Sequence, residues 1–277
     1  MQRDDIAFLA VMLRRRSGLM LANPKPHAIE GKLAPVVRRF GFKNAASLVA
    51  ELRHGHDALA RAVTEAMTTN DSSFFRDRVA FDHLRETILP TLIRRRAATK
   101  RLRIWSAACA SGQEPYSIAM TLDDLKLQSE GWTVDLIATD LNSQMVARAE
   151  HGVFSHFEVQ RGLPIRRLIA HFTQDGHDWR IAEPLRRMVR FRQFNLLDSY
   201  GWLDDIDLIL CRNVLMYFEP RIRSGVLERA AEILIGDGYL MLGPAEGTEG
   251  SAFFAPAGQM RGVYVKAGKP AARTAAG

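Results

Sequence analysis

The chain has 277 residues and a formal net charge of +7, from 38 Lys and Arg against 31 Asp and Glu. Hydrophobic residues make up 47% and charged residues 25%, which is typical of a globular protein and excludes collagen-like, low-complexity and disordered chains. No apolar run approaches the roughly 20 residues that span a bilayer, so we expect no membrane insertion. Two cysteines, Cys109 and Cys211, are too few for a disulfide framework and favour a cytoplasmic location.

The positive charge is concentrated in the first third of the chain. Residues 1–100 contain 18 Lys and Arg against 10 Asp and Glu, whereas residues 101–277 contain 20 against 21. A basic surface attracts nucleic acid, anionic lipid or an acidic protein partner. Composition does not choose among these, and a solvated face without a partner is the simplest interpretation.

Residues 1–95 are predicted to be helical, because their apolar residues recur at helical spacing. Gly41 is typical of the residue that ends a helix, and Ser47 of one that begins the next. The following helices are separated by the polar segment 68–73, and the last is predicted to be interrupted near Pro90.

From residue 101 onward, short apolar runs alternate with amphipathic stretches. The runs predict strands at 102–107, 134–139, 189–194, 208–211 and 239–242, with helices at about 114–128, 142–151 and 220–235. This alternation predicts an α/β fold with a parallel sheet covered by helices on both faces. Residues 153–188 break the alternation and predict an inserted subdomain, and residues 268–277 read as a disordered tail.

Polar residues follow four of the predicted strands, where parallel sheets bind ligands. The small-residue loop 109–115 (CASGQEP) enters a helix, whose free N–H groups suit an anionic group. Asp140 suits ribose hydroxyls, or it caps the next helix. Asn195 and Asn213 suit an adenine edge or an amino-acid group, or local turns. Together they indicate a nucleotide-like cofactor; no Cys or His group has metal-ligand spacing.

Five segments resemble, in order, the CheR-type chemotaxis methyltransferases over residues 10 to 265. The segments are 68–76 (TTNDSSFFR), 105–117 (WSAACASGQEPYS), 138–140 (ATD), 195–197 (NLL) and 211–218 (CRNVLMYF). The resemblance implies S-adenosylmethionine as cofactor, with S-adenosylhomocysteine as its product. It also implies a Rossmann-like methyltransferase sheet with an all-α N-terminal domain and a small inserted β-subdomain. The expected domains are 1–90 and 91–267, with the insertion at about 153–188.

The site residues implied by the resemblance are carried over position by position. Those expected at the cofactor are Asn70, Ser72, Arg76, Glu114, Asp140, Asn195, Leu196, Asn213 and Val214. Arg76 and Tyr217 are the candidates for positioning the substrate; otherwise Arg76 pairs with Asp77 or Asp82, and Tyr217 packs in the core. Ser72 stands where the family has Thr, which predicts a looser contact. Gln113 replaces a frequent Glu, which we expect to remove a negative charge beside the cofactor.

The function implied is methyl transfer to glutamate side-chain carboxylates of chemoreceptors in chemotaxis adaptation. A glutamate with an ordinary pKa near 4.3 is ionised at pH 7, so it needs no general base. Two alternatives stay open: a non-catalytic module that binds S-adenosylmethionine, and a nucleic-acid methyltransferase. The second is weakened because CRNV stands where base methylases often carry an acidic-aromatic tetrad.

The partner expected from the resemblance is a receptor helix bundle rich in glutamate. The basic first third, including Arg38, Arg39 and Arg94–Arg96, would then be a landing surface for that acidic bundle. Phe172–Trp179 looks shorter than in relatives that bind a receptor pentapeptide. We therefore expect docking without pentapeptide tethering, and no nucleic-acid partner.

Overall fold

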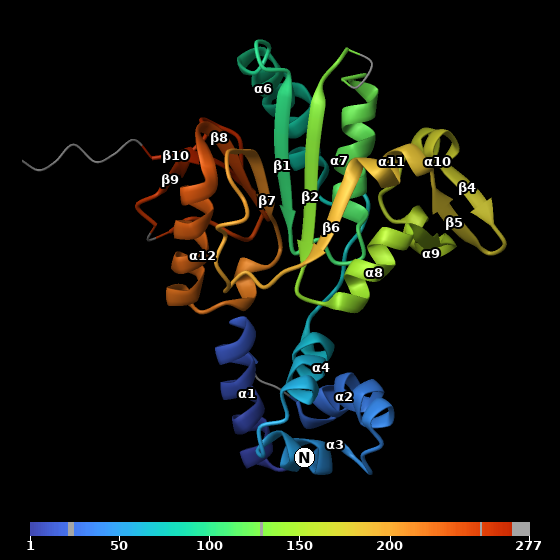
Figure 1. Ribbon diagram of the computed structural model, residues 1–277, viewed down its shortest axis with the longest axis vertical. Helices are drawn as coiled ribbons and strands as arrows, with labels where there is room; N and C mark the ends of the chain where they lie inside the picture. Colours follow the sequence, from blue (N-terminus) through green and yellow to red (C-terminus); the bar gives the residue numbers. More distant parts are fainter. Residues whose placement is uncertain (22–24, 128–129, 250, 268–277) are drawn as a thin grey trace, which may run out of the picture.

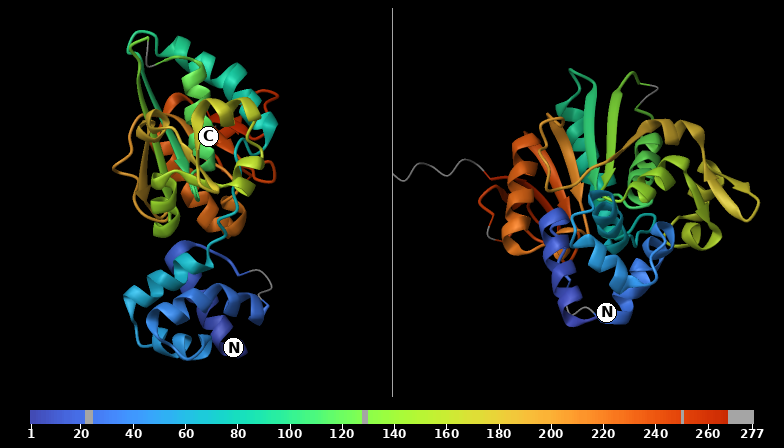
Figure 2. Two further views of the ribbon diagram at one scale, coloured as in Figure 1. Left: turned by 90° about the vertical axis from the view of Figure 1, so that its right-hand side faces the viewer. Right: turned by 60° about the horizontal axis from the view of Figure 1, so that its bottom comes forward.

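The computed structural model describes residues 1–21, 25–127, 130–249 and 251–267. The tail predicted at 268–277 lies outside the described residues. Four helices at the N-terminus share one apolar core that is separate from the rest of the molecule. They are α1 (Arg3–Ser17), α2 (Pro26–Phe40), α3 (Ala45–Leu52) and α4 (Asp57–Met67). Figures 1 and 2 show this group beneath a second, larger lobe, joined to it by the chain that leaves α4.

The larger lobe is built on one seven-stranded sheet in the order β6-β2-β1-β7-β8-β10-β9. Its strands are β1 (Arg101–Ala107), β2 (Thr133–Asp140), β6 (Val189–Gln193), β7 (Ile206–Cys211), β8 (Leu234–Leu242), β9 (Phe254–Pro256) and β10 (Val263–Lys266). The first five strands in that order run parallel, β10 pairs antiparallel with β8, and β9 pairs antiparallel with β10. This confirms the predicted α/β fold and its five strands. The short strands β9 and β10 escaped prediction because three or four residues are too few to show a period.

Helices cover both faces of this sheet, since alternate residues of β1 enter different cores. Leu102 and Ile104 pack with α7 (Gln113–Asp124) and the helices of residues 78–95, whereas Trp105 packs with α12 (Pro220–Ile233). The helix α8 (Ser143–His151) follows β2. Both faces of the central strands are therefore apolar, as a parallel sheet requires.

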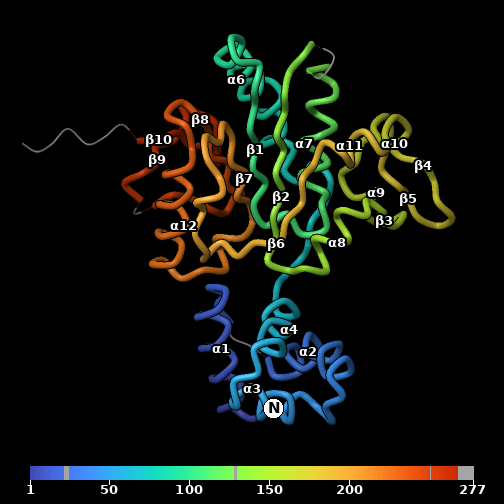
Figure 3. Tube along the Cα trace, viewed as in Figure 1, coloured from blue at the N-terminus to red at the C-terminus, as the bar shows by residue number. Residues whose placement is uncertain are grey.

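Residues 153–188 form a small unit beside the sheet, seen at the right of Figure 3. Its elements are β3 (Val153–Ser155), α9 (His156–Gln160), α10 (Ile165–His171), β4 (Phe172–Asp175), β5 (Asp178–Ile181) and α11 (Glu183–Met188). The strands make an antiparallel sheet in the order β3-β5-β4, and β4 turns into β5 through two residues. The insertion thus carries three short helices besides its strands.

One local expectation in the first third needs correction. Ser47 does not begin α3: Asn44 caps that helix, and its side chain accepts the Ser47 backbone N–H. The interruption expected near Pro90 is present as a break in the α-helical pattern. A π-helical turn, η1 (Leu84–Ile88), joins α5 (Arg78–His83) to α6 (Leu89–Arg95), so that Pro90, which lacks an N–H, stands in the first turn of α6.

The basic residues of the first third do not share one surface. The helix α6 lies at the end of the sheet farthest from α1–α4 (Figure 1). Arg96 is 14% exposed and is paired with Asp207 and Asp237. The prediction that Arg94–Arg96 belong to a landing surface on the N-terminal helices is therefore wrong. Residues 1–70 alone hold 11 Lys and Arg against 6 Asp and Glu.

No helix of the described residues is both long enough and apolar enough to cross a bilayer.

Candidate functional site

A pocket lies at the carboxyl ends of β1, β2 and β7, where the sheet meets the end of α1 and the segment 68–76. All ten predicted site residues line it. They are Asn70, Ser72, Arg76, Glu114, Asp140, Asn195, Leu196, Asn213, Val214 and Tyr217. Residues that sequence reasoning did not assign also line it, including Ser17 at the end of α1, Leu19 just after that helix, Asp71 and Arg212.

The loop after β1 brings its backbone to the pocket by unusual dihedral angles. Ala108 and Ala110 have φ values of 56° and 48°, and Gly112 has a φ of 95°. A Cβ atom on Gly112 would lie 2.9 Å from the Cβ of Ala149, so only glycine fits between the loop and α8. The helix α7 begins one residue later.

Asp140 is fixed by two backbone donors at the end of β2. One carboxylate oxygen accepts the N–H of Ala110 and the other accepts the N–H of Asn142, both at 2.8 Å. The alternative that Asp140 caps α8 is wrong, because Asn142 occupies that position. Burial raises the pKa of Asp140 above its ordinary value. Each oxygen keeps a further acceptor site, so the group fits a ligand that presents paired hydroxyls.

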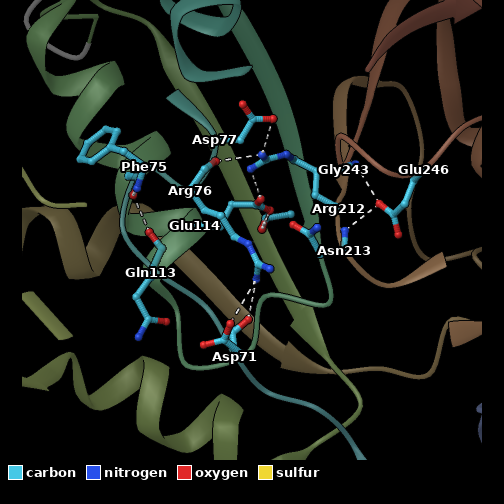
Figure 4. Close-up of polar contacts among 12 residues, drawn as sticks. Asp71, Phe75, Arg76, Asp77, Gln113, Glu114, Arg212, Asn213, Gly243 and Glu246 are labelled. Carbon is cyan, nitrogen blue, oxygen red and sulfur yellow. Dashed lines mark hydrogen bonds and ion pairs between the residues drawn. The ribbon is translucent and has the colours of Figure 1, made fainter. Parts of the chain in front are cut away.

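Glu114 and Arg212 form a buried ion pair behind the pocket (Figure 4). Glu114 also accepts the hydroxyl of Ser106 at 2.8 Å. Arg212 is 1% exposed, and it donates to Glu114 at 3.0 Å and to the carbonyl of Arg76 at 2.8 Å. Sequence reasoning gave Arg212 no role, although an arginine that ends an apolar strand needs acidic or carbonyl partners. This network ties β7, α7 and the segment before α5 together.

Arg76 reaches the pocket from a sharply bent backbone. The residues on either side of it have positive φ values, 49° at Phe75 and 64° at Asp77. Its guanidinium donates to the carbonyl of Asp71 at 2.8 Å and lies 3.9 Å from the Asp71 carboxylate (Figure 4). The expected partners Asp77 and Asp82 are wrong, because Asp77 faces Arg212 and Asp82 faces arginines of α5 and η1.

Asn70 and Ser72 come from the same segment. Within the described part of the chain, neither side chain makes a hydrogen bond, so both keep their polar groups for a ligand.

Asn213 is positioned by Glu246, which sequence reasoning missed. Asn213 has a φ of 59°, and its N–H is donated to Glu246 at 2.7 Å. The same carboxylate accepts the N–H of Gly243 at 2.8 Å (Figure 4). It also accepts the N–H of Met216 at 3.2 Å. Glu246 thus holds the loops after β7 and β8 against each other. Val214 and Tyr217 follow in the first loop, and Tyr217 packs partly against the α12 face of the core.

Two polar side chains are held by contacts within the protein. The Asn195 amide donates to the carbonyl of Arg16 at 2.7 Å and accepts the N–H of Leu197 at 3.1 Å, which fixes this side chain in the wall of the pocket and leaves one N–H and one acceptor site on its amide. Gln113 points away from the pocket and donates to Glu158 at 3.2 Å. A Glu at 113 would repel Glu158, which explains the neutral residue there.

The first lobe closes one side of the pocket. The N–H of Met20 is donated to the carbonyl of Tyr217 at 2.9 Å, and Leu19 forms a β-bridge with Phe218. A Cβ atom on Gly18 would lie within 3.2 Å of Ile222, Leu197 and Phe218, so this approach also needs glycine. In the described parts of the chain, no group of three or more His, Cys, Asp or Glu could hold a metal ion.

Comparisons with known proteins agree with this geometry. The sequence profile of the family described as "CheR methyltransferase, SAM binding domain" matches residues 70–255. The chain is 37% identical over 246 residues to chemotaxis protein methyltransferase 1 of Pseudomonas aeruginosa, covering 87% of this chain and 89% of that one. It is 36% identical over 251 residues to chemotaxis protein methyltransferase Cher2 of Pseudomonas putida, covering 89% and 91%. It is 38% identical over 245 residues to the chemotaxis protein methyltransferase of Vibrio parahaemolyticus, covering 86% and 87%.

Proposed function

Because this chain belongs to the CheR methyltransferase family of S-adenosylmethionine-dependent chemotaxis enzymes, we propose that it methylates glutamate side-chain carboxylates of chemoreceptors. When bound, S-adenosylmethionine supplies a methyl group on a positively charged sulfur. Asp140, with one acceptor site left on each oxygen, would hold the ribose hydroxyls. The side chains of Asn70, Ser72 and Asn213, which make no hydrogen bond to other described residues, would bind the polar groups of the same ligand.

The observation that carries this proposal is the lack of a general base among the described residues that line the pocket. Glu114 is already paired with Arg212. Burial raises the pKa of the Cys109 thiol well above its ordinary value, so it stays protonated near pH 7. The remaining carboxylates, Asp71 and Asp140, are held by an arginine and by backbone N–H groups. Such a site suits a nucleophile that arrives ionised, and a glutamate carboxylate does.

Orientation then supplies the catalysis. Well-oriented reactants can gain roughly 7–11 kcal/mol. Arg76, with a side chain 38% exposed at the pocket, would orient the incoming carboxylate. Tyr217 would line the other side of its path. Because Arg76 also contacts Asp71, it would orient the carboxylate without fully neutralising it.

The receptor would dock without a C-terminal pentapeptide tether. The two-residue turn between β4 and β5 supports this, since it leaves only a small loop on the insertion.

The enzyme would meet the receptor in the cytoplasm. Its two free cysteines support this location, because they suit a reducing compartment.

The decisive experiment incubates the protein with methyl-labelled S-adenosylmethionine and a chemoreceptor cytoplasmic fragment. We expect label in the fragment that mild alkali releases as methanol, which identifies a carboxyl methyl ester. Parallel reactions contain DNA or RNA. Label in nucleic acid, or binding of S-adenosylmethionine without any transfer, would overturn the proposal in favour of one of the two alternatives.

A further inference from the structure

Two arginines from different parts of the fold share the carboxylate of Asp71. Arg161, which follows α9 in the insertion, donates to one Asp71 oxygen at 2.9 Å. Arg76 lies 3.9 Å from the other oxygen and is bonded to the Asp71 carbonyl. The guanidinium of Arg161 also lies 5.8 Å from the ring centre of Phe157, which holds it from the insertion side. We call Arg76, Asp71 and Arg161 the rim triad.

The insertion packs directly against the segment that carries Asp71 and Arg76. Gly162, next to Arg161, has a φ of 84°, and a Cβ atom there would lie 2.1 Å from the carbonyl oxygen of Phe74. The buried ring of Phe74 packs edge-on against Phe154 and Phe172 of the insertion, with centroids 5.0 and 5.6 Å away. The position of Asp71 relative to Arg161 is therefore set by a packed core as well as by a surface ion pair.

Charge counting shows what Arg161 adds. Arg76 and Asp71 alone would be a neutral pair. Asp71 would then neutralise the Arg76 guanidinium, which is the positive charge that an incoming carboxylate needs. With Arg161 the rim triad has a net charge of +1. We propose that Arg161 is a positioning residue that occupies Asp71 and so leaves Arg76 available for the substrate carboxylate, giving the pocket its preference for an ionised side chain over the neutral amide. This rests on the proposed function, since it names how the same site selects glutamate.

The pKa of Asp71 is consistent with this arrangement. It is lowered chiefly by the hydrogen bond from Arg161, with a smaller contribution from the charge of Arg76. The stronger partner of Asp71 is therefore the arginine that does not reach the pocket. Arg161 is 41% exposed, so its contribution is that of a partly solvated pair.

The test compares Arg161→Gln, Asp71→Asn and the double variant with wild type. Net charges of the rim triad are then 0, +2 and +1, against +1. We expect Arg161→Gln to raise KM for the receptor fragment about three- to fivefold at low salt. It should leave kcat and the Kd for S-adenosylmethionine unchanged. The double variant should recover the wild-type KM, because it restores the net charge without restoring either contact.

The matched control is Arg166→Gln, which removes the same charge from an exposed arginine nearby in α10. A second arm measures, by calorimetry, binding of a receptor-derived peptide carrying Glu or Gln at the methylated position. The preference for Glu should fall in Arg161→Gln and return in the double variant. If Arg161→Gln matches Arg166→Gln in both arms, or the double variant is not rescued, the inference is wrong. Failure of wild type to form any methyl ester would instead overturn the proposed function, and the peptide arm would still decide the role of Arg161.

Discussion

The side chains of Arg212 and Glu114 meet at 3.0 Å behind the pocket, with 1% and 13% of their surfaces exposed. Arg212 directly follows the buried strand β7 and Glu114 stands in the first turn of α7, so one ion pair joins the end of a strand to the start of a helix at the pocket. Because Arg212 also holds the carbonyl of Arg76, the pair sets the position of the backbone behind the candidate catalytic arginine.

Replacing Arg212 by Met should therefore destabilise the fold. Glu114 would be left buried without its partner, and breaking a buried pair costs about 3–5 kcal/mol. Urea unfolding measures this change in the free energy of unfolding. The control is Arg221→Met, an exposed residue in the first turn of α12, for which we expect a change within about 0.5 kcal/mol. Equal stability of the two variants would contradict this role of the pair.

Replacing Asp140 by Ala should weaken binding of S-adenosylmethionine. The carboxylate would no longer accept the ribose hydroxyls, and hydrogen bonds to a charged group contribute about 1.5–3 kcal/mol, or roughly 10- to 150-fold in Kd. Isothermal titration calorimetry measures the loss. Asp198→Ala serves as the control at a carboxylate that does not line the pocket. An unchanged Kd in Asp140→Ala would exclude the proposed contact.

Replacing Arg76 by Ala should abolish methyl-ester formation while the protein stays folded. Its side chain is 38% exposed and bonds to the nearby Asp71, so its removal should change the free energy of unfolding by no more than about 0.5 kcal/mol. Transfer of labelled methyl groups and urea unfolding are the paired measurements. Wild-type turnover would remove Arg76 from the site.

The two cysteines predict how stability falls in alkali. Burial raises the pKa of the Cys109 and Cys211 thiols well above the ordinary value of 9.0. Above pH 9 the unfolded chain therefore loses thiol protons that the folded chain keeps, and the free energy of unfolding decreases as the pH rises. Urea unfolding at pH 7 and pH 10 should show a steeper decrease for wild type than for the double variant Cys109→Ala/Cys211→Ala. Parallel decreases would contradict thiol burial as the cause.

Reversing the charges of Arg38 and Arg39 should weaken methylation of the receptor fragment and reduce its salt dependence. Both are exposed at the end of α2, on the lobe that closes the pocket. Charge steering of this kind fades over a screening length of about 8 Å at physiological ionic strength. Arg94→Glu/Arg101→Glu is the control, because Arg94 lies in α6 and Arg101 begins β1, at the end of the sheet away from α1–α4 (Figure 1). If the two double variants have the same methylation rate and the same salt dependence, the basic residues of α2 do not steer the receptor and are only exposed to solvent.

The parallel sheet and the residues at its strand ends were predictable, because a buried strand and the polar residue after it are both local in sequence. Asp140 and Asn213 follow apolar runs directly, and the sheet then brings them together. The partners that hold these residues were not predictable, because they come from distant segments. Glu246 reaches Asn213 across 33 residues, and Arg161 reaches Asp71 across 90. The contact that fixes Asn195, with the Arg16 carbonyl, spans 179 residues.

Both lobes of the molecule line the pocket, because the end of α1 contributes to its wall. The family profile begins at residue 70, yet Ser17 and Leu19 belong to the wall of the pocket. A ligand bound there would contact both lobes and would therefore stabilise their association. Hydrogen exchange should accordingly slow at the last turn of α1 when S-adenosylmethionine binds, and a fragment beginning at residue 70 should hold the cofactor less tightly than the whole chain.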